Sequence, residues 1–172
     1  ASFAHVLPIL FKDNILHYQQ SDHTFTPEDT ENSMLDKWDH RFLELAKHIS
    51  TWSKDPSTKV GAVIANTDNR RVVSTGFNGF PKGVEDHVER LENREIKYEM
   101  VAHAELNALL FAGDRAQGGT LYVYPLPPCA RCAVTIIQAG IKRVVSPTTD
   151  RAKWGESTKI AETMFSESGV EL

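Results

Sequence analysis

The chain of 172 residues has little cysteine, no long apolar run and no excess of basic residues. Two cysteines cannot form a disulfide scaffold, and the apolar run at 108–112 (ALLFA) is far shorter than a membrane span. The 19 Lys and Arg stand against 23 Asp and Glu, for a net charge of −4, which disfavours nonspecific binding to nucleic acid. These features predict a globular, cytoplasmic protein.

The regularity of the sequence changes near residue 33. Residues 1–32 mix short apolar pieces with the polar stretch SDHTFTPEDTENS and have no clear period. We interpret them as an N-terminal arm that packs on the domain or, as we favour, on a neighbouring subunit. Residues 33–172 have the length of one domain.

Periodic patterns in this domain predict alternating helices and strands. Apolar residues spaced four and three apart from Trp38 to Trp52 predict an amphipathic helix, with Ser33 and Asp36 as its capping box. Short β-branched runs and Ala/Leu-rich runs follow. They predict a hairpin (59–65 and 71–76), further strands (118–124 and 141–145) and helices (100–112, 129–139 and 157–168). The charged stretch 84–99 is interpreted as an insert that is a solvated loop or short helix. This order predicts an α/β domain with helices on both faces of a largely parallel sheet.

The first chemical motif is His103-Ala104-Glu105. An isolated H-x-E triplet is weak, because seven histidines in this chain also produce a second one at 87–89, which we interpret as solvated surface. His103 differs because it opens a predicted apolar helix, where free backbone N–H groups favour anionic ligands.

The second motif contains both cysteines, Cys129 and Cys132, in a C-x-x-C arrangement. Two unrelated buried thiols are one reading of this pair. A thioredoxin-like redox pair is another, although that motif usually follows the first strand of its fold, and this one follows the third predicted strand. A metal site is the third reading.

Together the two motifs favour the metal site. Each lies where a helix begins after a strand or loop, so both are expected at one edge of the sheet. His103, Cys129 and Cys132 supply three ligands, which is the number in a catalytic zinc site with one open position. Glu105, two residues beyond the imidazole, would then accept a proton from water and pass it on. A histidine–glutamate pair with P-C-x-x-C is the signature of zinc nucleobase deaminases.

The sequence resembles the zinc-dependent cytidine/deoxycytidylate deaminase superfamily, and most closely its deoxycytidylate (dCMP) deaminase branch. The resemblance spans roughly residues 36–147. It rests on these stretches: DPSTKVGAVIAN (55–66), STGFNGFPKG (74–83), HAELNALL (103–110), GTLYVY (119–124) and PCARCAVTIIQAGIKRVV (128–145).

The resemblance implies a three-layer fold around a mixed, mostly parallel five-stranded sheet. It implies Zn²⁺ on the three ligands and proton transfer by Glu105 during hydrolytic deamination of a cytosine nucleotide, dCMP to dUMP with release of ammonia. Asn78 would contact the sugar, and the backbone N–H of Ala104 would contact the ring carbonyl. Alternatives are another nucleobase or nucleoside, a tRNA adenosine, or a non-catalytic zinc-stabilised assembly module.

The resemblance also implies partners other than the substrate. Members of this branch are usually homo-oligomers, often hexamers, and many respond to dCTP and dTTP.

The loop 124–129 is one residue longer than is common in the family and is expected to border the pocket. Candidate phosphate contacts are Lys59, Lys82, Arg115 and Lys153.

Overall fold

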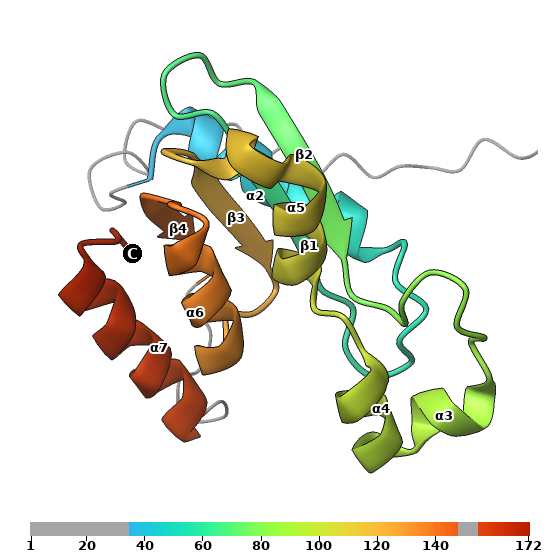
Figure 1. Ribbon diagram of the computed structural model, residues 1–172. Helices are drawn as coiled ribbons and strands as arrows, with labels where there is room; N and C mark the ends of the chain where they lie inside the picture. The colour runs from blue at the N-terminus through green and yellow to red at the C-terminus, as the bar shows by residue number, and fades with distance from the viewer. Residues whose placement is uncertain (1–34, 148–154) are drawn as a thin grey trace, which may run out of the picture. The chain divides into compact units, whose positions relative to one another are not determined.

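The computed structural model describes residues 35–147 and 155–172 (Figure 1). The predicted arm at 1–32, Ser33 and Lys153 lie outside the described residues. Within the described ranges, no helix has both the length and the apolar character needed to cross a bilayer.

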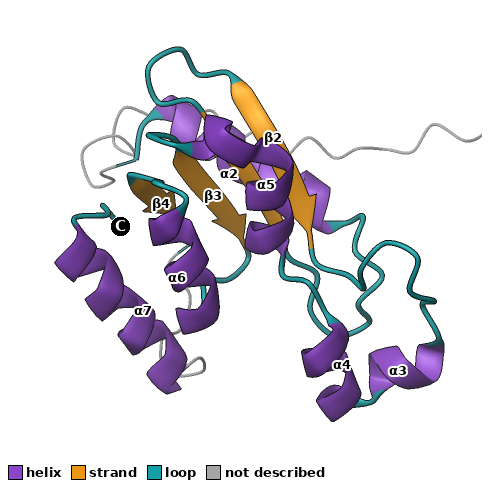
Figure 2. Ribbon diagram, in the orientation of Figure 1, coloured by secondary structure: helices purple, strands orange, loops and turns teal. Residues whose placement is uncertain are grey.

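The described strands form one mixed sheet in the order β2-β1-β3-β4. The predicted hairpin consists of β1 (Gly61–Ala65) and β2 (Val72–Phe77), which pair antiparallel. β1 also pairs antiparallel with β3 (Thr120–Tyr124), and β3 pairs in parallel with β4 (Arg143–Val145). The domain is therefore of the α/β class, with a mixed sheet that contains parallel and antiparallel pairs (Figure 2).

The prediction of five mostly parallel strands is wrong in both details for the described residues. Four strands are described, and two of the three neighbouring pairs are antiparallel. The reason is the position of β1, which lies between the parallel-running β2 and β3 and points the other way. At the free edge of β4, Glu171 forms only an isolated parallel bridge with Arg143.

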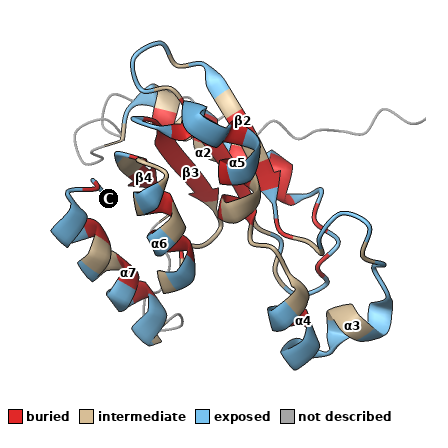
Figure 3. Cartoon of the chain, viewed as in Figure 1, coloured by how far each residue is buried: buried red, intermediate tan, exposed pale blue. Residues whose placement is uncertain are grey.

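Helices cover both faces of the sheet, as the sequence predicts. α2 (Lys37–Ser50) covers one face, where Phe42, Ala46 and Ile49 pack against alternate residues of β1 and β3. On the opposite face lie α5 (Ala104–Ala112), α6 (Ala130–Gln138) and α7 (Gly155–Ser168). Figure 3 shows the buried residues concentrated in the sheet and in the helix sides that face it.

The N-terminus of α2 differs from the predicted capping box. Asp36, not Ser33, is the N-cap, and Asp39 is the partner that accepts a hydrogen bond from the Asp36 N–H. Asp39 is buried and also accepts hydrogen bonds from the Tyr122 hydroxyl (2.8 Å) and from both terminal nitrogens of Arg143 (2.7 and 2.9 Å). These bonds connect α2 to β3 and β4 and explain why a charged residue occupies the core.

A glycine sets the spacing between the sheet and α5. A Cβ atom on Gly76 of β2 would overlap the carbonyl oxygen of Ala104 and lie 2.5 Å from the backbone nitrogen of Ala108. Glycine therefore allows the first turn of α5 to lie directly on β2. This contact fixes the position of His103, the residue just before the helix.

The charged insert forms two short helices away from the sheet, α3 (Val88–Glu92) and α4 (Arg94–Met100). Asn93 is the N-cap of α4, and its side chain accepts hydrogen bonds from the N–H groups of Glu95 and Ile96. The chain after α4 leads into His103. The interpretation of His87 as a surface residue is confirmed, because its half-exposed ring pairs with Glu85. Lys97, however, is buried.

Candidate active site

The two chemical motifs meet at the edge of the sheet where β2 and β3 end. His103 is the N-cap of α5 and Cys129 is the N-cap of α6, both with extended backbone. Cys132 lies in the first turn of α6 and is buried. The helix starts thus bring residues 26 and 29 positions apart into contact.

The geometry of these three residues fits one tetrahedral metal ion. The Nδ1 atom of His103 lies 3.2 Å from the Sγ of Cys132 and 3.6 Å from the Sγ of Cys129, and all three ligand atoms lie within 4.8 Å of one another. Two ligands on one tetrahedral zinc ion, with bonds of about 2.0–2.3 Å, are about 3.5 Å apart. The donor set of one imidazole and two thiols is also one that zinc prefers.

His103, Cys129 and Cys132 form a triad, and the hydrogen bonds within it favour the thiolate form of Cys129. The pKa of Cys129 is lowered to about 4, because the Cys132 thiol and the His103 ring stabilise its thiolate more than burial disfavours it. The pKa of Cys132 is raised by its bond to Cys129 and by burial. A divalent cation would favour both thiolates together, since the thiolate is the form that binds metal.

Glu105 lies in the first turn of α5 and lines the same cavity as His103 and Cys129. Its side chain is almost fully buried, and burial raises its carboxyl pKa above the ordinary value, although the nearby His103 opposes this shift. A buried carboxyl beside a metal triad has the position of a general acid and base.

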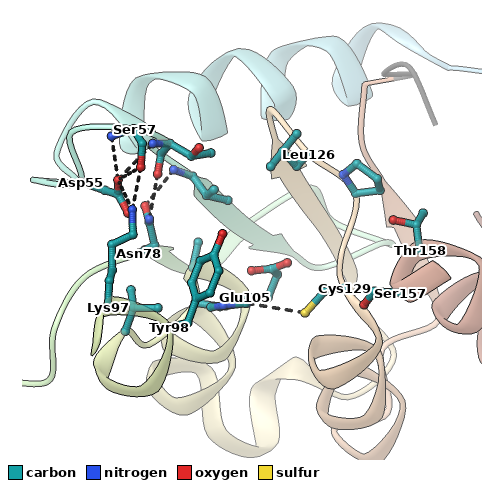
Figure 4. A pocket seen from close by; sticks show the side chains of 16 residues that line it. Asp55, Ser57, Asn78, Lys97, Tyr98, Glu105, Leu126, Cys129, Ser157 and Thr158 are labelled. Carbon is teal, nitrogen blue, oxygen red and sulfur yellow. Dashed lines mark hydrogen bonds and ion pairs between the residues drawn. The ribbon is translucent and has the colours of Figure 1, made fainter. Parts of the chain in front are cut away.

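Figure 4 shows the cavity with the triad side on one wall and a polar cluster on the other. The backbone of Ala104 and the side chains of His103, Glu105 and Cys129 form the first wall. The loop before β1, the residue after β2 and α4 form the second. Its members are Asp55, Ser57, Thr58, Val60, Asn78, Lys97 and Tyr98. The loop 124–129 borders the cavity through Leu126 and Pro127, as the sequence predicts.

Asn78 is buried, and its carboxamide is held by the loop before β1. Its Oδ1 accepts a hydrogen bond from the Val60 N–H (2.8 Å), and its Nδ2 donates to the Thr58 carbonyl (2.9 Å). An amide nitrogen carries two hydrogens, and within residues 35–147 and 155–172 this one donates a single hydrogen bond, which leaves its second hydrogen to serve a ligand.

The predicted phosphate contacts that are described lie elsewhere. Lys59, Lys82 and Arg115 are exposed, and none of them lines the cavity. Arg115 follows the C-terminal end of α5, opposite to His103, and its guanidinium donates to the carbonyls of Phe111 and Ala112. Within one copy of the chain, the structure does not bring these side chains to the triad.

Sequence reasoning missed several residues of the cavity. Lys97 and Tyr98 belong to the insert that was interpreted as solvated, and Ser157 and Thr158 belong to the start of α7. The one available signal was the motif DPSTK, which contains Asp55, the ion-pair partner of Lys97. No helical or strand period marks Lys97 as buried.

In this α/β domain, one imidazole and two thiols meet at neighbouring helix starts beside a buried glutamate. This combination is typical of the hydrolytic zinc deaminases. Comparison with protein families gives the particular group. Residues 36–148 match the family model of the cytidine and deoxycytidylate deaminase zinc-binding region, and the chain belongs to this family.

Individual relatives agree with this assignment. The chain is 46% identical to an uncharacterised deaminase of Aliivibrio fischeri, over 81% of this chain and 94% of the relative. It is 40% identical to deoxycytidylate deaminase of Mus musculus, over 78% and 77% of the two chains. Among solved structures, apo dCMP deaminase of cyanophage S-TIM5 superposes with a TM-score of 0.60 at 26% identity, covering 80% of this chain and 97% of that chain.

Proposed function

We propose that this chain catalyses the hydrolytic, zinc-dependent deamination of dCMP to dUMP and ammonia. The observation that carries the proposal is the convergence of His103, Cys129 and Cys132 beside buried Glu105, with His103, Cys129 and Glu105 lining one cavity. The substrate follows from relatives, because several at 36–40% identity are named deoxycytidylate deaminases. The cyanophage enzyme is also known in complex with dCMP and dUMP.

In the reaction, water attacks C4 of the cytosine ring, the C4–N bond breaks and ammonia leaves. When bound by His103, Cys129 and Cys132, zinc would supply a Lewis acid that lowers the pKa of water to about 7. Glu105 accepts one proton from the attacking water and delivers it to the departing amine, and the second proton of that water ends on ring N3 of the uracil product. Its burial keeps bulk water from competing for that proton.

Two further groups of this chain orient the substrate. The Ala104 N–H is the first of α5, and the first N–H groups of a helix have no partner inside the helix. It therefore donates to the carbonyl oxygen of the ring. The second hydrogen of the Asn78 amide donates to the sugar, since the loop before β1 uses the other one.

The assembly is part of the same proposal. We infer a homo-oligomer, of which a hexamer is the form usual in this branch, with dCTP and dTTP as candidate effectors. Native mass spectrometry with and without each triphosphate tests the subunit count and the effectors together.

The test of the reaction is direct. Zinc-loaded protein is incubated with dCMP, CMP, dCTP and deoxycytidine, and the loss of cytosine absorbance and the release of ammonia are followed. Turnover with a preference for dCMP supports the proposal. Turnover of another member of the panel corrects the substrate, and zinc binding with no turnover of any cytosine compound contradicts the proposed reaction.

A further inference from the structure

Two ion pairs connect the insert 84–99 to the loop before β1, and they differ sharply in burial. Lys54 pairs with Asp86 at 2.6 Å, with side chains 72% and 34% exposed. Lys97 pairs with Asp55 at 3.2 Å, with side chains only 9% and 7% exposed. Neighbouring positions of one loop therefore provide a surface pair and a buried pair.

The buried pair lies in the wall of the cavity. Among the described residues that line the cavity, Lys97 is the one lysine or arginine. Lysine is rarely buried, and a buried ion pair commonly adds little to stability over apolar residues of similar size. Its place opposite the triad (Figure 4) suggests a role in substrate binding.

The contacts of Lys97 lead to Asn78 in three steps. The Lys97 ammonium donates to the Asp55 carboxylate (3.2 Å) and to the Ser57 hydroxyl (2.6 Å). The same Asp55 oxygen accepts the backbone N–H groups of Ser57 (2.8 Å) and Thr58 (3.0 Å), which fixes the turn of the loop. The carbonyl of Thr58 then accepts from the Asn78 amide.

We propose that Lys97 is a positioning residue for the substrate: through Asp55 and Ser57 it holds the loop that orients the Asn78 carboxamide. This inference rests on the proposed function, since Asn78 is taken as the sugar contact. The triad and Glu105 are held by α5 and α6 instead. Loss of Lys97 therefore weakens binding of the nucleotide and leaves the chemical step intact.

The test compares Lys97→Met with the matched surface variant Lys54→Met. For Lys97→Met, KM for dCMP rises about tenfold or more, the scale of a lost hydrogen bond to a charged group. Its kcat stays within about twofold and its zinc content is unchanged. Lys97→Arg, which keeps the charge and the donors, restores most of the KM, and Lys54→Met matches the unmodified protein.

Two further measurements guard against a variant that fails to fold. Ser57→Ala removes one partner of Lys97 without leaving a charge unpaired, and it raises KM by a smaller factor. Hydrogen exchange of the Thr58 and Val60 amides is faster in Lys97→Met and Ser57→Ala and unchanged in Lys54→Met. Exchange needs no substrate, so it tests the positioning of the loop even if dCMP is not turned over.

Three results would overturn the inference. The first is a KM for Lys97→Met and Ser57→Ala equal to that of Lys54→Met. The second is a fall in kcat or zinc content as large as the rise in KM, which indicates general disruption. The third is unchanged amide exchange at Thr58 and Val60. Failure of the unmodified protein to deaminate dCMP would instead contradict the proposed function.

Discussion

Replacing Gly76 by alanine tests whether the close contact between β2 and α5 sets the geometry of the metal triad. The added Cβ atom would lie 2.5 Å from the Ala108 nitrogen and would overlap the Ala104 carbonyl oxygen. Both obstacles are backbone atoms of one helix, so no side-chain rotation relieves them. The helix itself must move away from the strand.

The size of the effect follows from the overlap. An ordinary contact of about 3.5 Å requires a shift of α5 by about 1 Å. Overpacking of this kind costs about 1–3 kcal/mol of folding free energy. The shift displaces His103 and Glu105 relative to the two cysteines on α6, whereas zinc bonds tolerate only about 0.2 Å. A misplacement of about 1 Å can lower the rate about 100-fold.

The assay measures three quantities on Gly76→Ala: zinc content by elemental analysis, the free energy of unfolding in urea, and kcat/KM for dCMP. All three fall. Gly79→Ala is the matched control, because a Cβ atom there has no heavy atom within 4 Å, and this variant keeps its zinc and stability. Full zinc occupancy and activity in Gly76→Ala would refute the link between strand contact and triad geometry.

Three other predictions concern the triad, its glutamate and the buried network. Glu105→Gln keeps zinc and fold but loses a factor of about 100–10,000 in kcat; near-normal turnover would contradict its role in proton transfer. Cys132→Ala, like removal of zinc by a chelator, lowers both metal content and melting temperature, measured by elemental analysis and calorimetry, and an unchanged melting temperature would show that the metal does not support the fold. Burial opposes ionisation of Asp39, but hydrogen bonds from Arg143, the Asp36 amide and Tyr122 outweigh it and lower its pKa below the ordinary value. Its contribution to stability is therefore complete above the ordinary pKa and is lost as the pH falls through the lowered one. Asp39→Asn, which breaks a buried ion pair, costs about 3–5 kcal/mol at neutral pH and flattens this acid dependence in urea titrations; an equally steep dependence would refute the assignment.

The sequence predicted the triad wall of the site well, because its residues lie in two short motifs at helix starts. His103 and Cys129 are the N-caps of α5 and α6, and each precedes an apolar, Ala-rich segment, but the helix predicted from residue 100 begins only at Ala104. The hairpin and the later helices also follow from period and turn chemistry. Such local signals need no knowledge of which strand lies beside which.

The rest depends on contacts between distant segments. A hairpin followed by a crossover helix can place the next strand beside either hairpin strand, and the apolar run of β1 indicates an inner strand without showing the direction of its second neighbour. Lys97 lies in a charged segment, and only its pairing with Asp55, 42 positions earlier, makes its burial understandable. The N-cap of α2 was predicted at Ser33, but Asp36 is the cap and Asp39 completes its capping box. Asp39 is also bonded to Tyr122 and Arg143, far along the chain, which the local pattern does not indicate.

The two walls of the cavity come from separate segments, and this separation has a consequence for protein engineering. The insert 84–99 and the loop 53–60 are joined by the buried Lys97–Asp55 pair, and the loop also holds the Asn78 amide, so an exchange of this wall has to preserve both contacts. Grafting both segments from a deaminase of different specificity would alter which nucleotide is accepted while the reacting groups stay in place. Transplanting either segment alone would separate Asp55 from Lys97 and leave this wall of the cavity without its buried ion pair.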